Sequence, residues 1–314
     1  MKSIVITGGV AFDHIMAMPS RFKDHIMPDK IHMLNVSFNV DKLRKERGGT
    51  GGNQAYNLAL LGIQPKLIAS AGKDFKEYKK DLEVLGVDVS LIVEHKDDFM
   101  ASGFVVTDQD DNQVWSFYSG AMSRAKEIDI KKHIDSNCLV VVSPNDHQAM
   151  KRYVFDCDEM RVECLFDPAF WINNFSKNDL RDCILKSSIL IGNDYEIELL
   201  QRKTKLTKKD ILKGKKILIT TLGAKGSLIE KEDKQFKIPA AKPKNTSDPT
   251  GAGDAYRAGF VAGYVKGLPL SICGRMGSVA AVYTVEKYGT QTHKFSLKEF
   301  KNRYKENFGE SLAL

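Results

Sequence analysis

The stretch Asp248-Pro249-Thr250-Gly251-Ala252-Gly253-Asp254-Ala255-Tyr256-Arg257-Ala258-Gly259-Phe260 predicts a glycine-rich turn that leads directly into a helix. Asp-Pro starts a turn, because proline fixes its own φ and biases the preceding residue away from helix. Gly251 and Gly253 let the backbone approach a ligand closely. From Ala255 to Val265 small residues recur on one face, which indicates a helix. The unpaired N–H groups at its start predict an anion-binding site.

Asp254 lies at the mouth of this predicted anion site, where a carboxylate would repel a bound phosphate. General-base catalysis would explain it: Asp254 would take a proton from a hydroxyl group while the N–H groups of Ala252 and Gly253 hold the transferred phosphoryl group. The alternative is a helix N-cap, a position at which aspartate is preferred. We favour catalysis, because two glycines, Asp-Pro and a small-residue helix occur together.

This run closely resembles the C-terminal signature of the ribokinase-like (PfkB) family of sugar and nucleoside kinases. The resemblance implies that Asp254 is the catalytic base and that Gly251, Ala252 and Gly253 form the anion hole. A second stretch, Gly48-Gly49-Thr50-Gly51-Gly52-Asn53-Gln54-Ala55, resembles the N-terminal signature of the same family. The family fold implied is a three-layer α/β/α sandwich with a small β-sheet lid.

The composition is that of a globular protein, with 314 residues, 42% hydrophobic and 28% charged. The net charge of +7 is spread along the chain and would attract an anionic substrate, and no nucleic-acid-binding signature accompanies it. The five cysteines include no CxxC pair, which predicts a reducing compartment. We find neither a signal peptide nor an apolar run of membrane-spanning length. We therefore expect a cytoplasmic protein that binds neither nucleic acid nor membrane.

Hydrophobic patterns predict the other elements. The strand-like segments are Ser3–Thr7, Met33–Val40, Pro65–Ser70, Val87–Val93, Ala101–Thr107, Gln113–Tyr118, Cys138–Val142, Val162–Phe166, Ser188–Ile191 and Lys216–Thr221. The helical segments besides the first one are Tyr56–Leu61, Phe75–Leu85, Leu270–Lys287 and Leu297–Phe308. Strand and helix alternate from Cys138 onward, which is typical of a parallel sheet with helices on both faces.

Two β-rich runs flank Asp108–Asn112 and predict a hairpin. Together with the strand expected near Ser37, this hairpin would form a small sheet outside the main one. Such a lid would exclude water from phosphoryl transfer. We expect one ribokinase-like kinase domain over residues 1–314, with lid segments at about 13–47 and 99–119.

The resemblance also implies which residues bind the acceptor. Those implied to contact the sugar or the base are Asp13, Ser37, Gly49, Asn53, Phe104 and Phe117, and Phe170 is a further candidate that the residue itself suggests. Asp13 follows a strand and two glycines, as ligand-facing residues of open α/β sheets often do, although the residue alone could simply form a turn. Asn53 offers both a donor and an acceptor to vicinal hydroxyls, or it could cap a helix. Aromatic residues of a hairpin usually pack, whereas those of a lid could contact a base.

Two stretches at strand ends imply the ATP site. Asn193-Asp194-Tyr195-Glu196 resembles the family motif NxxE, which orders Mg²⁺ and phosphates through waters, and it could also be a capped helix start. The run from Thr220 to Gly226 resembles the family's VTxGxxG turn, which meets the ATP phosphates. The residues implied to bind ATP are Asn193, Thr221, Gly223 and Gly226, with Mg²⁺ bound through water at Asn193 and Glu196. A site for K⁺ is further implied at Asp248.

Within the family the chain is similar to bacterial adenosine kinases of the mycobacterial type. The stretches that carry this similarity are TGGVAFDHIMAMPSRF (7–22), LNVSFNVDKLRKERGGTGGNQA (34–55), SFYSGAMSRA (116–125), NDYEIELL (193–200) and SDPTGAGDAYRAGF (247–260). The similarity implies an ATP-dependent kinase that phosphorylates the ribose 5′-hydroxyl of a nucleoside, with adenosine as the expected acceptor. A homodimer is also implied, because the edges of a lid sheet must be covered.

One stretch departs from those adenosine kinases. After Asp167-Pro168 they have two glutamines that address adenine, whereas this chain has Ala169-Phe170-Trp171. Gly9 also replaces a serine near the first strand. Phe170 and Trp171 could stack on a base or simply pack. Two alternatives therefore remain: a ribose or fructose kinase of the same family, and a non-catalytic relative that binds nucleosides.

Overall fold

The computed structural model describes residues 2–214 and 216–313, and within them a nine-stranded sheet forms the centre of the molecule. Its strand order is β13-β12-β11-β10-β9-β8-β1-β4-β5. The strands are β1 (Ser3–Thr7), β4 (Lys66–Gly72), β5 (Ile92–His95), β8 (Cys138–Val142), β9 (Glu163–Phe166), β10 (Ile189–Asn193), β11 (Ile217–Thr221), β12 (Ser227–Lys231) and β13 (Lys234–Ile238). From β11 to β5 the strands are parallel, and β12 and β13 add an antiparallel edge.

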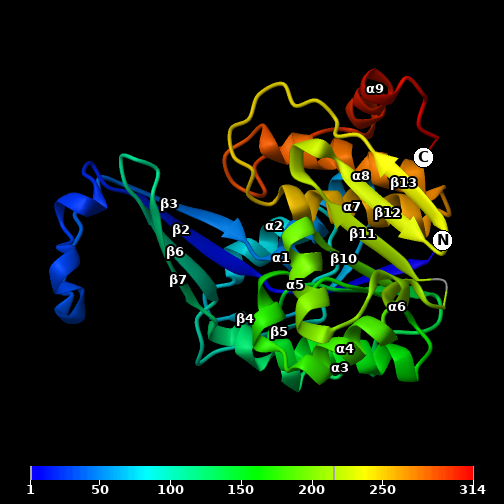
Figure 1. Ribbon diagram of the computed structural model, residues 1–314, viewed down its shortest axis with the longest axis horizontal. Coiled ribbons are helices and arrows are strands. Elements are labelled where there is room, and N and C mark those ends of the chain that lie inside the picture. Colours follow the sequence, from blue (N-terminus) through cyan, green and yellow to red (C-terminus); the bar gives the residue numbers. More distant parts are fainter. Residues whose placement is uncertain (1, 215, 314) are drawn as a thin grey trace.

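Helices cover both faces of this sheet, because its strands are apolar on both sides. One face is covered by α1 (Thr50–Leu60), α2 (Lys76–Val84), α7 (Ala252–Val265), α8 (Leu270–Val285) and α9 (Leu297–Phe308), and the other by α3 (His147–Glu159), α4 (Lys177–Lys186), α5 (Asp194–Thr204) and α6 (Lys208–Leu212) (Figure 1). Within β1, Ile4 and Ile6 join the first core and Val5 joins the second. The three-layer α/β/α prediction is confirmed.

Short 3₁₀ helices connect several of these elements. They are η1 (Phe22–Asp24), η2 (Pro28–Met33), η3 (Gly120–Glu127), η4 (Ile130–Lys132), η5 (Ala169–Asn174) and η6 (Gly223–Lys225). Among the described residues, no helix combines the length and the apolar character needed to cross a bilayer.

A second sheet of four strands projects from the body, in the order β3-β2-β6-β7 (Figure 1). Its strands are β2 (Ala11–Ala17), β3 (Lys42–Gly48), β6 (Ala101–Thr107) and β7 (Gln113–Tyr118). The predicted hairpin is confirmed as β6 and β7, which pair in antiparallel register. We call these four strands the small sheet.

The strand predicted over Met33–Val40 is wrong. Its alternating apolar residues meet no sheet, so that Met33 is 79% exposed and Leu34 is 55% exposed. The strand lies instead at Lys42–Gly48, where the polar sequence KLRKERG pairs with β2 along its whole length. A charged sequence suits an edge strand that is exposed to water, because pairing there needs only the backbone.

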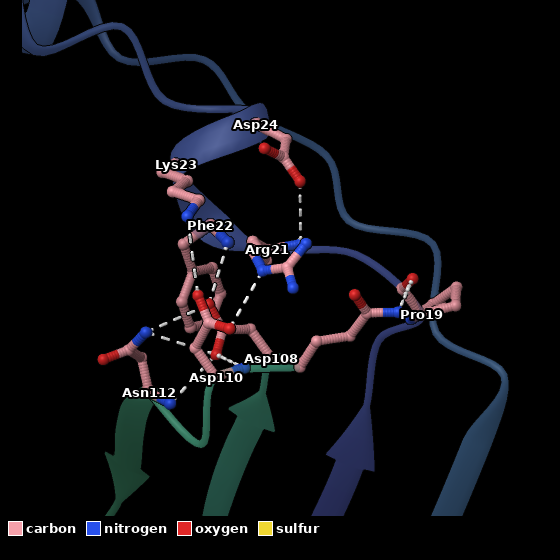
Figure 2. Close-up of polar contacts among 9 residues, drawn as sticks. Pro19, Arg21, Phe22, Lys23, Asp24, Asp108, Asp110 and Asn112 are labelled. Carbon is pink, nitrogen blue, oxygen red and sulfur yellow. Dashed lines mark hydrogen bonds and ion pairs between the residues drawn. The ribbon is translucent and has the colours of Figure 1, made fainter.

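Residues 18–41, which we call the arm, extend beyond the small sheet (Figure 1). The arm is attached to the turn between β6 and β7 through Asp108, as Figure 2 shows. The Asp108 carboxylate accepts hydrogen bonds from the backbone N–H groups of Phe22 (3.0 Å), Asp110 (2.9 Å) and Asn112 (2.9 Å). Arg21 also pairs with Asp110 at 2.9 Å. The start of the arm is therefore held to the tip of the hairpin.

Several element boundaries differ from the predictions, among them that of α1, which begins at Thr50 and not at Tyr56, and two others have a clear physical cause. The strand expected over Val87–Val93 is Ile92–His95, because a turn at Asp88, whose carboxylate accepts the Ser90 N–H at 3.0 Å, interrupts the apolar run. The helix expected from Ala255 begins at Ala252, since Gly251 is its N-cap.

Candidate active site

A cavity of about 360 Å³ opens where the carboxyl ends of β9, β10 and β11 meet the first turns of α1 and α7. Its lining residues are Thr50, Pro144, Asp167, Ala169, Phe170, Asn193, Glu196, Thr221, Gly223, Gly251, Gly253, Asp254 and Arg257. Ligands of open α/β sheets bind at this edge of the parallel strands. The structure thus brings most of the residues predicted for catalysis and for ATP binding into one cavity, with Ala252 and Gly226 outside its lining.

The turn before α7 has the shape of an anion site. Gly251 has φ +79°, and a Cβ there would come within 2.9 Å of Thr290 Cγ2, so the position requires glycine. The N–H of Ala252 donates to the Pro249 carbonyl at 3.1 Å. Gly253 follows within the first turn, where N–H groups have no acceptor in the helix. Of the two predicted donors, Gly253 is therefore better placed than Ala252 to hold an anion.

Asp254 is the buried acid of this turn, with 9% of its surface exposed. It lies in the first turn of α7 but does not cap the helix, because Gly251 is the N-cap and no side chain caps this helix. Asn53 Nδ2 donates to Asp254 Oδ2 at 2.8 Å. Burial raises the pKa of Asp254 to about 6, although Arg257 and the Asn53 hydrogen bond oppose the rise. A carboxylate with this pKa is a better proton acceptor than an exposed aspartate.

Arg257 and Asp167 form a buried ion pair beside Asp254. Arg257 Nη2 donates to Asp167 Oδ1 at 2.8 Å, and Arg257 Nε also contacts Asp167 Oδ2. The two residues are 6% and 1% exposed. Burial raises the pKa of Asp167 even though Arg257 opposes it. The pair joins the end of β9 to α7, so the loop after β9 and the anion turn keep a fixed separation.

The start of α1 approaches β1 and β2 closely. Gly49, the N-cap of α1, has φ +83°, and a Cβ there would come within 2.7 Å of the Ala11 nitrogen. The N–H of Gly51 donates to the Gly9 carbonyl at 3.0 Å. Three residues along α1, Asn53 is 4% exposed and reaches Asp254. The glycines that resemble the family signature therefore let α1 come close enough for Asn53 to contact Asp254 of α7.

Asn193 and Glu196 cap α5 reciprocally while both line the cavity. Asn193 Oδ1 accepts the Glu196 N–H at 2.8 Å, and Glu196 Oε2 accepts the Asn193 N–H at 2.8 Å. Burial and the charge of Asp167 raise the pKa of Glu196. The second oxygen of Glu196 remains available to waters of a hydrated Mg²⁺, so these residues fit that ion through water. Among residues 2–214 and 216–313, no three His, Cys, Asp or Glu side chains cluster as direct metal ligands.

A family model described as pfkB family carbohydrate kinase matches residues 8–296. The chain belongs to the PfkB family. It is 30% identical over 305 residues to the nucleoside kinase of Methanocaldococcus jannaschii, covering 93% of each chain. Its fold matches the nucleoside kinase of Burkholderia thailandensis in complex with inosine, with a TM-score of 0.88 and 31% identity over 98% of this chain and 99% of the other. The prediction of a family phosphotransferase is confirmed.

Sugar kinases of the PfkB family are also similar to the chain. The ribokinase of Lactococcus lactis is 28% identical over 276 residues, covering 82% of this chain and 86% of its own. These relatives carry the names of nucleoside kinases and a ribokinase, and they do not single out the mycobacterial type of adenosine kinase.

Asp13 of this PfkB kinase lies on β2 opposite Glu46 of β3 and Gly103 of β6. A Cβ at Gly103 would come within 2.8 Å of Asp13 Oδ1, so glycine leaves room for the carboxylate. Burial, followed by the nearby Glu46 charge, raises the pKa of Asp13 to about 6. The partly buried Asp13 and the buried Asp254 therefore both have a pKa raised to about 6.

The structure does not bring Ser37, Phe104 and Phe117 together at the cavity. Phe117 pairs with Gly103 and so shares the Asp13 face of the small sheet. Phe104 pairs with His14 on the opposite face and stacks on its ring at 4.7 Å. Ser37 is an exposed residue of the arm. The sequence could not assign these faces, because they depend on a strand pairing with β2 that was not predicted.

Two other predicted residues, Gly226 and Asp248, have roles in the backbone turns around the site. Gly226 has φ +93° in the turn before β12 and does not line the cavity, unlike Thr221 and Gly223. Asp248 accepts the N–H groups of Thr250 at 2.9 Å and of Gly289 at 3.2 Å, one with each carboxylate oxygen. Each oxygen accepts one hydrogen bond and keeps further acceptor capacity, so the K⁺ site at Asp248 stays a prediction, and we derive no step through that ion.

Two residues that hold Asn53, Thr290 and Gln291, were not predicted from the sequence. Asn53 Oδ1 accepts from Thr290 Oγ1 at 2.8 Å and from Gln291 Nε2 at 2.9 Å. Trp171, predicted either to stack on a base or to pack, packs against the small cluster of Ala11, Ala101 and Met122, and its Nε1 is buried without a hydrogen-bond partner. No local motif marks Thr290 or Gln291, because their partner lies more than 200 positions away in the chain.

Proposed function

We propose that this PfkB kinase transfers the γ-phosphoryl group of ATP to the 5′-hydroxyl of a nucleoside, with adenosine as the expected acceptor. The observation that carries the proposal is the shared cavity of Asp254, the Gly251–Gly253 turn, Asn193 and Thr221. Asp254 would accept the hydroxyl proton as the oxygen bonds to the γ-phosphorus. The bond from that phosphorus to the β–γ bridging oxygen breaks, and ADP leaves.

The other residues of the cavity would bind and orient the phosphates. The N–H of Gly253 faces the transferred group, and Thr221 and Gly223 meet the phosphates of ATP. Mg²⁺, bound through waters at Asn193 and Glu196, would neutralise phosphate charge when present. Asp13 and Asn53 would hold the ribose hydroxyls and so orient the acceptor toward Asp254.

The residues after Asp167-Pro168 support a nucleoside over a free sugar. Phe170 lines the cavity and is 63% exposed, and its ring centre lies 5.5 Å from that of Trp171. Such an aromatic surface suits stacking on a base. The relatives named nucleoside kinases point in the same direction.

The test is ADP formation from MgATP with adenosine, inosine, other nucleosides, ribose and fructose as separate acceptors. We expect turnover with nucleosides and the highest turnover with adenosine. A preference for another nucleoside would show that Phe170 and Trp171 select a different base. Turnover only with ribose or fructose would overturn the nucleoside assignment in favour of the second candidate, a sugar kinase, which the similarity to ribokinases supports.

The role of Asp254 is tested by Asp254→Asn, which preserves shape and removes the base. We expect turnover to fall on the order of 10²-fold or more. The unfolding temperature of the variant should not fall, because the substitution removes a buried charge. Near-normal turnover would refute the assignment of Asp254 as the base.

The proposal includes a lid at about 13–47 and 99–119 and a homodimer that covers it. Exposed apolar side chains gather on the arm and the small sheet, which supports a partner surface. They include Met27, Ile31, Met33, Leu34, Leu43, Val114, Trp115 and Phe117. Light scattering should give twice the mass of the chain, and a monomer mass would contradict it. All five cysteines are free and buried, which supports the expected reducing, cytoplasmic compartment.

A further inference from the structure

A chain of hydrogen bonds leads from Asp254 to the end of β3. Asn53 Nδ2 donates to Asp254 at 2.8 Å, and Asn53 Oδ1 accepts from Gln291 Nε2 at 2.9 Å. Gln291 Nε2 also donates to the Tyr78 hydroxyl, which donates to the Gly48 carbonyl at 2.9 Å. These bonds join α7, α1, the loop after α8, α2 and the small sheet.

The donor and the acceptor of every hydrogen bond in this series follow from the Gly48 carbonyl at its end. The Gly48 carbonyl can only accept, so the Tyr78 hydroxyl must donate to it. The Tyr78 oxygen must then accept from Gln291, which requires the Gln291 amide nitrogen at this point. That nitrogen also faces Asn53, which must present its carbonyl oxygen. Consequently the Asn53 amide nitrogen points at Asp254.

We infer that Gln291 is a positioning residue that holds the Asn53 amide with its nitrogen toward Asp254 and ties this arrangement to the end of β3. The inference rests on the proposed role of Asp254 as the base. Asn53 donates to Oδ2 of Asp254, and the Gln54 side chain is a second neutral hydrogen-bond partner of this carboxylate. Gln291 therefore acts through Asn53 and contacts neither the acceptor nor ATP.

The glycine at position 52 of α1 leaves room for this series of hydrogen bonds. A Cβ at Gly52 would overlap the Tyr78 hydroxyl and come within 3.4 Å of Gln291 Nε2. Tyr78 is fully buried, so its hydroxyl has no water to replace a lost partner. Thr290 Oγ1 lies 2.8 Å from both Asn53 Oδ1 and the Arg47 carbonyl, and its single proton can serve one of them at a time. Gln291 is thus the donor that Asn53 Oδ1 does not share with Arg47.

Several charged or titratable groups face Asp254 and would shape its response to pH. Arg257 of α7 lowers its pKa, and Asp167 at the end of β9 raises it. Tyr78 of α2 interacts electrostatically with Asp13 and Asp254 and has a raised pKa, so it stays neutral across the working range. None of these groups changes in a Gln291 variant. An altered pH profile would therefore reflect the orientation of the Asn53 amide together with any charge introduced at position 291.

The test is Gln291→Glu, which keeps the shape of the side chain. A carboxylate cannot donate to Asn53 Oδ1, so Asn53 would turn its nitrogen toward position 291 and its oxygen toward Asp254. We expect kcat to fall about tenfold or more. The acid limb of the kcat–pH profile should move to higher pH, because a carboxylate beside a carbonyl oxygen favours its protonated form. The KM for MgATP should stay within about twofold of the wild type, since the ATP residues are untouched.

The matched control is Gln64→Glu, which introduces the same charge at an exposed residue outside the site and should behave as the wild type. Tyr78→Phe keeps the buried ring and removes the hydroxyl that orients Gln291. This variant should shift the profile in the same direction by a smaller amount, and it decides the question if Gln291→Glu fails to fold.

Wild-type kcat and pH profile in Gln291→Glu, or in Tyr78→Phe where the first variant does not fold, would overturn the inference. The acceptor used is whichever compound of the panel turns over, so failure of the nucleoside assignment leaves this test intact. Full activity of Asp254→Asn would instead refute the base itself.

Discussion

Asp254 and Asp167 are buried side by side in the cavity wall, and their partners give them different chemistry. Asp167 has a guanidinium partner, Arg257, whereas the side-chain donor to Asp254 is the neutral Asn53 amide. Burial raises the pKa of both carboxyls, and the charge of Arg257 opposes the rise at both. The difference lies in their contacts, because Asp167 is held in an ion pair whereas a neutral amide donates to Asp254. A carboxylate with a pKa of about 6 suits a base that must accept a proton near neutral pH.

The kcat of the enzyme should therefore depend on pH in a way that an exposed aspartate would not produce. Burial raises the pKa of Asp254 from 3.8 to about 6, so the acid is protonated and inactive below pH 6. We expect kcat to fall about tenfold per pH unit below this value and to be level above it. The measurement is kcat at saturating acceptor from pH 4.5 to 8. A profile that stays level down to pH 4.5 would contradict the raised pKa.

The acceptor KM gives a separate reading of Asp13, because the pKa of that carboxyl is also raised to about 6. A rise of KM at acid pH without a further change in kcat would report Asp13 rather than Asp254.

At the scale of elements, α1 and α7 begin in the same way. Each has an N-cap glycine with positive φ, and each first turn borders the cavity. Gly49 and Gly251 let the chain turn sharply into a helix where a side chain would strike neighbouring atoms. The two helix starts differ in their donors, because the first N–H groups of α1 donate to the Gly9 carbonyl whereas the Gly253 N–H of α7 borders the cavity.

Two glycine substitutions separate the cost of backbone conformation from that of overlap. Gly309 has φ +75° with nothing within 4 Å of a Cβ, whereas a Cβ at Gly49 would overlap the backbone of Gly9 and Ala11. Gly309→Ala should lower the free energy of unfolding by about 1–2 kcal/mol, the cost of the left-handed conformation. Gly49→Ala should cost about 2–5 kcal/mol because overpacking is added. Equal losses in urea unfolding would contradict the overlap.

The arm and the hairpin tip form one unit through Asp108 (Figure 2). Burial alone would raise the pKa of Asp108. Hydrogen bonds from Phe22, Asn112 and Asp110 outweigh this effect and lower the pKa below its usual value, so the carboxylate stays charged. Asp108→Ala should speed tryptic cleavage of the arm by about tenfold or more while the unfolding midpoint of the whole protein stays the same.

Asp110→Ala is the control for this prediction, since it removes only ion pairs between exposed side chains. Such pairs contribute little, so cleavage of the arm should stay close to the wild-type rate. Equal cleavage rates in the two variants would show that Asp108 does not anchor the arm.

At the scale of the whole molecule, one sheet separates two apolar cores. Alternate residues of the same strands belong to different cores, as Ile4 and Val5 do. Loss of either core would expose the other face of the shared sheet. The body should therefore unfold in one cooperative step.

The two tryptophans make this testable, since Trp115 lies on the small sheet and Trp171 beside the cavity. In Trp115→Phe, the fluorescence of Trp171 alone should follow urea unfolding with the same midpoint as far-UV circular dichroism. Two separate midpoints would show that the cavity region opens before the body unfolds.

Local features of the chain were sufficient for much of the fold and for part of the candidate site. The glycine turns before Asn53 and Asp254, the alternation of strand and helix after Cys138, and the hairpin of β6 and β7 were all predicted correctly as elements. Each depends on a conformational demand within a few neighbouring residues, such as a positive φ or an apolar run. Such demands are written in the sequence itself.

Tertiary structure alone decided the contacts between those elements. β3 is a charged segment that becomes a strand only because β2 pairs with it, and that pairing also sends Phe104 and Phe117 to opposite faces. Gln291 meets Asn53 across 238 positions of the chain. Strand pairing and long-range hydrogen bonds depend on partners that no local pattern specifies, so the surroundings of Asp254 follow from the folded chain.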